Sequence, residues 1–280
     1  MTAVLLTGAG SGIGAATALR LDRAGIRVFA AVHDAADGEI LARGASPALS
    51  VHTVDVTDRA SVEALAEAVS SQLGAEPLTA VVNVAGEGIA GPLELLPIES
   101  LRHQLEVNVV GPVSVTQCVL PLLRRGRGGR VVFVGSMGGL VAVQFAGAYH
   151  ASKYAIEAIG DAWRQELAPD GIFVSIVEPG PVATPLWAKA VETLDRLPAS
   201  KRYAERIDAV RETLRKASKN SPNADKTAAA IQHAVVAEKP RTRYPVGVAA
   251  MVVPKVRRLV PDRLFDKAAQ QATTKGAKDE

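Results

Sequence analysis

The chain has 280 residues, of which 48% are hydrophobic and 22% charged, and its formal net charge at pH 7 is +3. A chain of this length and composition can bury a large core, and we expect one domain over residues 1–280. Aromatic residues make up only 4%, and the charge is too small to indicate a polyanion partner, so we expect no nucleic-acid interface.

Cysteine content and hydropathy exclude further classes. Cys118 is the only cysteine, which rules out an intrachain disulfide and a cysteine-rich zinc site, and we expect no metal. The chain does not open on a cationic leader, and no uninterrupted apolar stretch reaches the roughly eighteen residues of a membrane span. We therefore expect a cytoplasmic protein.

Short Val-rich runs alternate with Ala-rich helical patterns along most of the chain. Near-continuous apolar strands of this kind are typical of a parallel sheet that is covered by helices on both faces. Right-handed crossovers then give a doubly wound, three-layer α/β/α fold. Six strands are expected at residues 3–6, 27–32, 49–54, 79–84, 130–135 and 172–177, and a seventh at 242–247.

The first expected strand runs directly into the glycine-rich turn Thr7-Gly8-Ala9-Gly10-Ser11-Gly12-Ile13-Gly14. Glycines let the backbone turn sharply and approach a pyrophosphate, while the following helix offers free N–H groups and the positive end of its dipole. The strand before the turn and the helix after it supply the context that a bare glycine pattern lacks. The turn therefore predicts a dinucleotide site.

A second pattern, Tyr149-His150-Ala151-Ser152-Lys153, lies in a segment that is expected to be helical. Residues four apart share a helix face, so the Lys153 ammonium could lower the pKa of the Tyr149 phenol and make it an acid/base. In isolation the pair is weak, because Tyr and Lys at this spacing usually turn separately toward water. The other motifs decide between the two interpretations.

Taken together, the motifs resemble the short-chain dehydrogenase/reductase family, whose patterns T-G-x-x-x-G-x-G and Y-x-x-x-K both occur here. The matches span about residues 4–185. Val84 departs from the family's N-N-A-G, which would weaken hydrogen bonding between the central strands. Further matches follow in the family's order: Asp55-Val56, Asn83-Val84-Ala85-Gly86, Asn108 in "EVNVVG", Ser136, and Pro179-Gly180-Pro181-Val182-Ala183-Thr184.

The resemblance implies a Rossmann-type NAD(P)-dependent oxidoreductase acting on CH–OH groups, and a homodimer or homotetramer built on the helices at about 97–124 and 148–167. Hydride transfer to a carbonyl carbon leaves negative charge on oxygen, which needs a proton and hydrogen-bond donors already in place. Tyr149 would supply the proton, Ser136 would bond the substrate oxygen, and Lys153 would also bind the nicotinamide ribose.

Asn108 completes the catalytic set that the resemblance implies, by holding a water of a proton relay. Gly111 and Pro112 disfavour an uninterrupted helix here, so a local break could turn a backbone carbonyl inward. A plain structural asparagine at a kink is the alternative.

The resemblance also implies the cofactor contacts. Asp55 is expected at the adenine amino group, the Ala85-Gly86 peptide beside the adenosine ribose, and Pro179-Gly180 beside the nicotinamide. The full expected set is Gly8, Ser11, Gly12, Ile13, Gly14, His33, Asp55, Val56, Asn83, Ala85, Gly86, Tyr149, Lys153, Pro179, Gly180, Val182 and Thr184.

The choice between NAD and NADP depends on the end of the second strand, "RVFAAVHD". An acid there bonds the ribose 2′-OH and selects NAD, whereas a basic residue accommodates the 2′-phosphate of NADP. The usual acidic position holds Val32, the usual arginine position holds His33, and Asp34 follows. We lean to NADP because nothing acidic occupies the discriminating position. Asp34 leaves NAD open, and His33 could instead be a plain surface residue.

The substrate is expected at the carboxyl ends of the strands, under a lid formed by residues 184–220. The side chains around Tyr149 offer no fixed charge, so a steroid-, retinoid- or terpene-like secondary alcohol or ketone fits better than a sugar phosphate. "GPLELLP" and "RTRYPVG" resemble the retinol and hydroxysteroid dehydrogenase branch. The expected substrate contacts are Ser136, Met137, Val143, Phe145, Tyr149, Leu186 and Trp187.

The C-terminal extension, about residues 249–280, mixes apolar and basic residues. We expect it to pack on its own domain or a sister subunit rather than on a membrane, and its last eleven residues to be disordered. Two other functions stay open: a non-catalytic dinucleotide-sensing or interaction protein, and an acyl-carrier-protein ketoacyl reductase. The first would show a degraded catalytic set and the second a basic docking face near the lid, and the sequence has neither.

Overall fold

The computed structural model describes residues 2–275 and contains one seven-stranded sheet. The strand order is β3-β2-β1-β4-β5-β6-β7, and every neighbouring pair is parallel, as predicted. The order reverses between β1 and β4, which places the topological switch point beside the glycine-rich turn. The strands are β1 (Ala3–Thr7), β2 (Arg27–Val32), β3 (Leu49–Thr53), β4 (Ala80–Asn83), β5 (Arg130–Val134), β6 (Phe173–Pro179) and β7 (Arg243–Val246).

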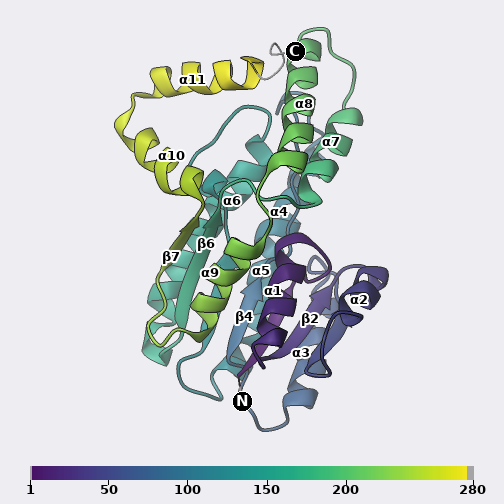
Figure 1. Ribbon diagram of the computed structural model, residues 1–280, viewed down its shortest axis with the longest axis vertical. Coiled ribbons are helices and arrows are strands. Elements are labelled where there is room, and N and C mark those ends of the chain that lie inside the picture. The colour runs from purple at the N-terminus through teal and green to yellow at the C-terminus, as the bar shows by residue number, and fades with distance from the viewer. Residues whose placement is uncertain (1, 276–280) are drawn as a thin grey trace.

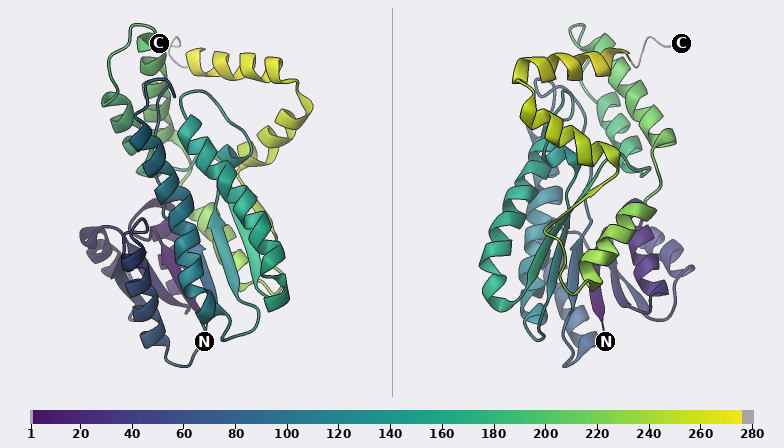
Figure 2. Two further views of the ribbon diagram at one scale, coloured as in Figure 1. Left: turned by 180° about the vertical axis from the view of Figure 1, so that it is seen from behind. Right: turned by 60° about the vertical axis from the view of Figure 1, so that its left-hand side comes forward.

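Helices cover both faces of the sheet, which gives the predicted three layers (Figures 1 and 2). One face carries α1 (Gly12–Arg23), α2 (Ala35–Ala42) and α9 (Asp225–Val236). The opposite face carries α3 (Arg59–Leu73), α5 (Gly111–Leu123) and α6 (Gly147–Glu166). Strand side chains alternate between the two layers: Leu5 lies in one core cluster, and its neighbours Val4 and Leu6 lie in the other.

One long helical run, residues 98–123, consists of α4 (Ile98–Leu105), a π-helical turn (η1, Glu106–Val110) and α5. The predicted break therefore takes the form of a π turn just before Gly111-Pro112, because Pro112 has no N–H to continue the α-helical bonds. The run has 26 residues, and an 18-residue window within it has a mean hydropathy of 1.3, so it is long and apolar enough to cross a membrane, contrary to our sequence expectation. Its α5 part packs on β4 and α3 in the core.

The expected lid consists of α7 (Leu186–Asp195) and α8 (Ala204–Asn220), which lie together beyond the carboxyl ends of the strands (Figure 1). They have a small core of their own with the loops below them, which includes Phe145, Leu194 and Ile207.

After β7, α10 (Val248–Leu259) and α11 (Asp262–Lys275) form an arm that reaches across to α8 (Figure 2). The expectation of a disordered end is wrong for residues 270–275, which are helical, and residues 276–280 lie outside the described part of the chain.

Candidate active site

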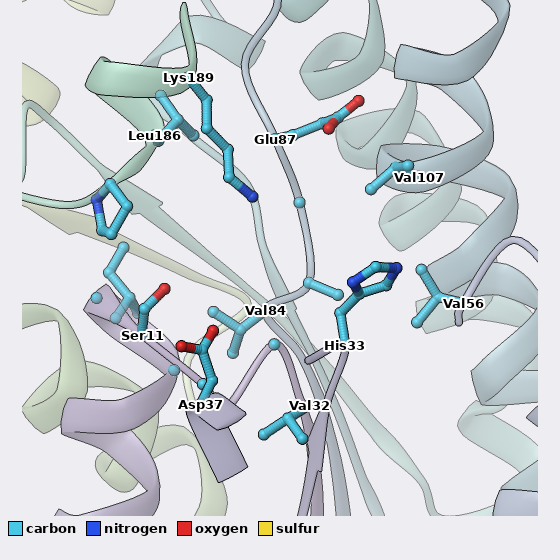
Figure 3. Close-up of a pocket in the computed structure, with 18 of the residues that line it drawn as sticks. Ser11, Val32, His33, Asp37, Val56, Val84, Glu87, Val107, Leu186 and Lys189 are labelled. Carbon is cyan, nitrogen blue, oxygen red and sulfur yellow. The ribbon is translucent and has the colours of Figure 1, made fainter. Parts of the chain in front are cut away.

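Two adjoining pockets open at the carboxyl ends of the strands. The first, here called the glycine-loop pocket, is a cavity of about 390 Å³ (Figure 3). The second, called the Tyr149 pocket, measures about 360 Å³. The residues common to both are Ile13, Val84, Gly86, Thr184 and Leu186.

The glycine loop leaves no space for side chains at two positions. A methyl group on Gly14 would lie 1.8 Å from the Gly8 carbonyl oxygen, and one on Gly8 (φ +69°) would lie 2.6 Å from the Ala85 nitrogen. Ser11 precedes α1 without capping it through its side chain, so the first N–H groups of the helix stay free toward the pocket. Free N–H groups at a helix N-terminus fit the pyrophosphate of a dinucleotide.

The opposite wall is formed by the lid. Lys189, on α7, is the only lysine or arginine that lines this pocket within residues 2–275, and Figure 3 shows its ammonium pointing into the cavity. The sequence analysis missed Lys189. Its signal was available, because it lies one helical turn into the segment that directly follows the Thr184 motif.

At the adenine end, Asp55 accepts hydrogen bonds from the backbone N–H of Thr57 (2.9 Å) and from its hydroxyl (2.7 Å). These bonds lower the pKa of the Asp55 carboxyl. Asp34 does not line the pocket: its Oδ1 accepts the Ala36 N–H at 2.9 Å and caps α2. Asp34, the acid that left NAD open in the sequence, is therefore engaged as the N-cap of α2.

Eleven of the expected cofactor contacts do line the glycine-loop pocket: Gly8, Ser11, Gly12, Ile13, Gly14, His33, Asp55, Val56, Ala85, Gly86 and Thr184. Pro179, Gly180 and Val182 line the Tyr149 pocket instead, together with Tyr149 and Lys153. Asn83 lines neither pocket. Its Nδ2 donates to the Thr116 hydroxyl at 2.9 Å, and its buried Oδ1 has no partner within the described residues. β4 is paired with β1 and with β5 up to Asn83, so the weakened bonding expected from Val84 stays a prediction.

All seven expected substrate contacts line the Tyr149 pocket. At its centre, Tyr149 is hydrogen-bonded to Ser136, whose Oγ also accepts the Gly138 N–H at 3.0 Å. Burial raises the pKa of the Tyr149 phenol, and the bond to Ser136 offsets part of this rise. The net shift thus runs opposite to the lowering by Lys153 that we predicted from the sequence.

Lys153 is 94% buried and faces the tyrosine, with Nζ 5.9 Å from the centre of the Tyr149 ring. Its ammonium donates to the Val134 carbonyl oxygen at 2.9 Å, which fixes it at the end of β5. Desolvation lowers the pKa of Lys153 to about 8, although the nearby charge of Glu157 acts in the opposite direction. An ammonium has three donors, so two remain for other groups in the pocket.

Asn108 lies in the π turn η1, and its side chain is fully engaged. Oδ1 accepts the Glu87 N–H at 2.9 Å, while Nδ2 donates to the Glu87 carbonyl at 2.9 Å and to the Ser152 hydroxyl at 3.0 Å. A methyl group on Gly86 would lie 3.2 Å from Asn108 Oδ1 and 3.7 Å from Lys153 Nζ, so these groups are neighbours. The Asn108 side chain thus braces the Glu87 loop against α6, and its water-holding role stays a prediction.

Phe145 shapes the outer wall of the Tyr149 pocket. It is the only non-glycine residue with a positive φ (64°) among those described, a strained conformation that surrounding contacts must hold. Its carbonyl accepts the Gly91 N–H at 2.7 Å, and its ring meets Tyr203, at the start of α8, edge to face at 6.2 Å. The ring contact between Phe145 and Tyr203 therefore links the loop before α6 to the lid.

A group of charges, of which Glu157 and Glu178 are buried, lies behind Lys153. Arg243 Nε is 3.1 Å from Glu157 Oε2 and 3.2 Å from Glu178 Oε1, and its Nη2 is 2.8 Å from Asp161. One guanidinium thus faces three carboxylates. Burial, followed by the negative charge of Glu178, raises the pKa of Glu157 to about 7.

The sequence matches a family model described as "short chain dehydrogenase" over residues 2–195. The chain belongs to the short-chain dehydrogenase family. Retinol dehydrogenase 5 of Mus musculus is 35% identical over 277 residues, which cover 94% of this short-chain dehydrogenase and 86% of that protein. An NADPH-dependent 3-dehydrocapnine reductase of Ornithobacterium rhinotracheale is 32% identical over 271 residues, 95% of each chain.

The fold agrees with the sequence match. The crystal structure of a short-chain dehydrogenase from Streptomyces avermitilis superposes with a TM-score of 0.79 at 28% identity, covering 100% of this chain and 99% of that one. The protein is thus an NAD(P)-dependent oxidoreductase of the retinol and hydroxysteroid dehydrogenase-like branch, as the motifs predicted.

Proposed function

We propose that this short-chain dehydrogenase moves a hydride between a nicotinamide cofactor and a lipophilic secondary alcohol or ketone, with Tyr149 as the general acid/base. The observation that carries the proposal is the apolar Tyr149 pocket. Its wall brings Ser136, Tyr149 and Lys153 together directly beside the glycine-loop pocket. No aspartate, glutamate or arginine of the described chain lines it, and its only titratable cationic groups are Lys153 and His150. Burial lowers the pKa of His150, which favours its neutral form and an uncharged substrate.

The cofactor, when bound, donates or accepts the hydride. The residues of the chain hold the reacting oxygen and its proton. Tyr149 gives its proton to the carbonyl oxygen during reduction, and Ser136 donates a hydrogen bond to the same oxygen. Lys153 places positive charge beside the phenol as it ionises, which favours the phenolate.

The glycine loop, the N-terminus of α1 and Lys189 surround the space for the pyrophosphate, which supports NAD(P) binding there. The sequence favours NADP, because nothing acidic ends β2, and one relative is named as NADPH-dependent. The Asp37 carboxylate beside Gly10 favours NAD instead.

We also propose a homodimer or homotetramer that pairs through the long helices. Apolar side chains are exposed there, with Ile98 51%, Val110 48% and Tyr154 44% accessible. Size-exclusion chromatography with light scattering should give a mass two or four times the 29.2 kDa of one chain. A monomer at all concentrations would contradict this proposal.

The substrate class is tested with the purified chain, both NADH and NADPH, and a panel of steroids, retinoids, terpene alcohols and small diketones, followed by absorbance at the nicotinamide band. We expect turnover with at least one bulky apolar alcohol or ketone and none with a sugar phosphate. Tight cofactor binding with no turnover would favour a dinucleotide-sensing protein instead. A strong preference for acyl thioesters would favour a ketoacyl reductase.

A further inference from the structure

Asp37 lies in the first turn of α2 and turns its side chain back toward the glycine loop. A methyl group on Gly10 would lie 2.8 Å from Asp37 Cβ and 2.9 Å from its Oδ2, so this carboxylate touches the loop itself. It lines the glycine-loop pocket beside Gly10 and Ser11, and Figure 3 shows it pointing up into the cavity. An acid five residues beyond Val32, the expected position at the end of β2, thus reaches the same corner of the pocket.

The Asp37 carboxylate has no hydrogen-bond or ion-pair partner among residues 2–275. Its neighbour Asp34 accepts a hydrogen bond from the Ala36 N–H as the N-cap of α2, whereas both oxygens of Asp37 remain open to the pocket. An ionised carboxylate is an acceptor only. A ligand at this corner therefore has to offer donors, such as the hydroxyls of a ribose.

Positive charge is missing from this corner. Val32, at the end of β2, is apolar and buried, and Lys189 approaches the pocket from the lid on the opposite wall. His33 is exposed, and Figure 3 shows its ring directed toward Val56 and away from Asp37. The charge of His33 acts on Asp55 instead.

We infer that Asp37 makes this enzyme selective for NAD(H), by accepting a hydrogen bond from the adenosine ribose and by repelling the 2′-phosphate of NADP(H). The inference rests on the proposed oxidoreductase function and deepens it. In the usual dinucleotide site the selecting acid follows the second strand, and here it comes from helix α2. A 2′-phosphate would bring close to two negative charges against an unpaired carboxylate with no guanidinium or ammonium beside it.

The test measures dissociation constants for NADH and NADPH on the full chain without substrate, from the change in nicotinamide fluorescence. We expect the wild type to bind NADH at least about tenfold more tightly, since a hydrogen bond to a charged group is worth about that factor. Asp37→Ser should weaken NADH about tenfold and leave NADPH unchanged or tighter. Asp34→Ser is the matched control, because serine still caps α2 while one nearby negative charge is lost. It should keep the NADH preference.

The outcomes separate this inference from the proposed function. Tighter binding of NADPH by the wild type, or an unchanged ratio in Asp37→Ser, would overturn the role of Asp37 and leave the oxidoreductase standing. A collapse of the ratio in Asp34→Ser as well would also overturn it, because the effect would then be one of general charge. Binding of neither cofactor by the wild type would overturn the proposed function together with this inference.

Discussion

Lys153 holds its ammonium 5.9 Å from the centre of the Tyr149 ring and bonds it to the Val134 carbonyl at the end of β5. The cation is therefore fixed by the sheet, and the phenol is fixed by the preceding turn of α6. Because both elements are rigid and buried, the geometry of the pair does not depend on surface side-chain freedom. Residue spacing alone left open whether the two would face each other.

Ser136 should tune the acid/base as well as bind the substrate oxygen. Its hydrogen bond lowers the pKa of Tyr149, so Ser136→Ala should raise that pKa further. For alcohol oxidation, which needs the phenolate, the rise of kcat with pH should move to higher pH, and kcat at neutral pH should fall by about 10- to 100-fold. Ser136→Thr, which keeps the hydroxyl, should restore part of the rate. An unchanged pH profile in Ser136→Ala would contradict the role in tuning.

Lys189 should contribute to the affinity for both cofactors alike, because it faces the pocket from the lid and is far from the Asp37 corner. Lys189→Met should raise the dissociation constants of NADH and NADPH by a similar factor of about ten. The gap in affinity between the variant and the wild type should shrink at high salt. Lys201→Met, an exposed lysine between α7 and α8 that lines neither pocket, is the control. Equal dissociation constants for Lys189→Met and Lys201→Met would contradict a contribution of Lys189 to cofactor affinity.

Gly14 should tolerate no side chain. In Gly14→Ala the new methyl group would overlap the Gly8 carbonyl, which lies 1.8 Å from the ideal position, so the glycine loop must move. We expect loss of cofactor binding and a fall of a few kcal/mol in the free energy of unfolding, measured by urea denaturation. Gly44→Ala is the control, since its methyl group would have 3.8 Å to its nearest neighbours. Wild-type cofactor affinity in Gly14→Ala would contradict the assigned loop geometry.

Glu157 should make stability fall as pH rises. Its pKa is about 7 in the folded protein and 4.5 when unperturbed, so between these values the folded state holds the extra proton. The free energy of unfolding then decreases with pH, by roughly 1 kcal/mol per pH unit from this group. Glu157→Gln should remove that slope.

The buried His150 and the half-buried His52 act in the opposite direction, because desolvation lowers the pKa values of both. The informative quantity is therefore the difference between wild type and Glu157→Gln, followed by urea denaturation between about pH 5 and about pH 7. The free energy of unfolding of Glu157→Gln should increase relative to that of the wild type as pH rises. A constant difference would show that Glu157 is already ionised in the folded protein.

The sheet was predictable because its signals are local. Parallel strands that are apolar on both faces leave continuous runs such as "TAVVNV" (residues 79–84), and β4 lies within that run. The Ser136, Tyr149 and Lys153 group followed from motif spacing. The positions of these three in one pocket agree with that prediction.

The features of the site that the sequence did not predict depend on contacts between distant segments. Lys189 and Asp37 reach the glycine-loop pocket from two helices whose orientation no local pattern specifies. Asp34 does not reach it, because its carboxylate caps α2. The sign of the Tyr149 pKa shift was wrong for a related reason: spacing shows the neighbouring cation but not the depth of burial, and burial dominates.

The most direct test of the account is single-turnover hydride transfer in Tyr149→Phe, at saturating cofactor and with a substrate that the wild type turns over. Phenylalanine keeps the ring and removes only the hydroxyl, so we expect unchanged cofactor affinity and unfolding free energy with a rate about 1,000-fold lower, within the range that general acid/base groups contribute. A single-turnover rate within a few-fold of the wild type would show that the proton comes from another group.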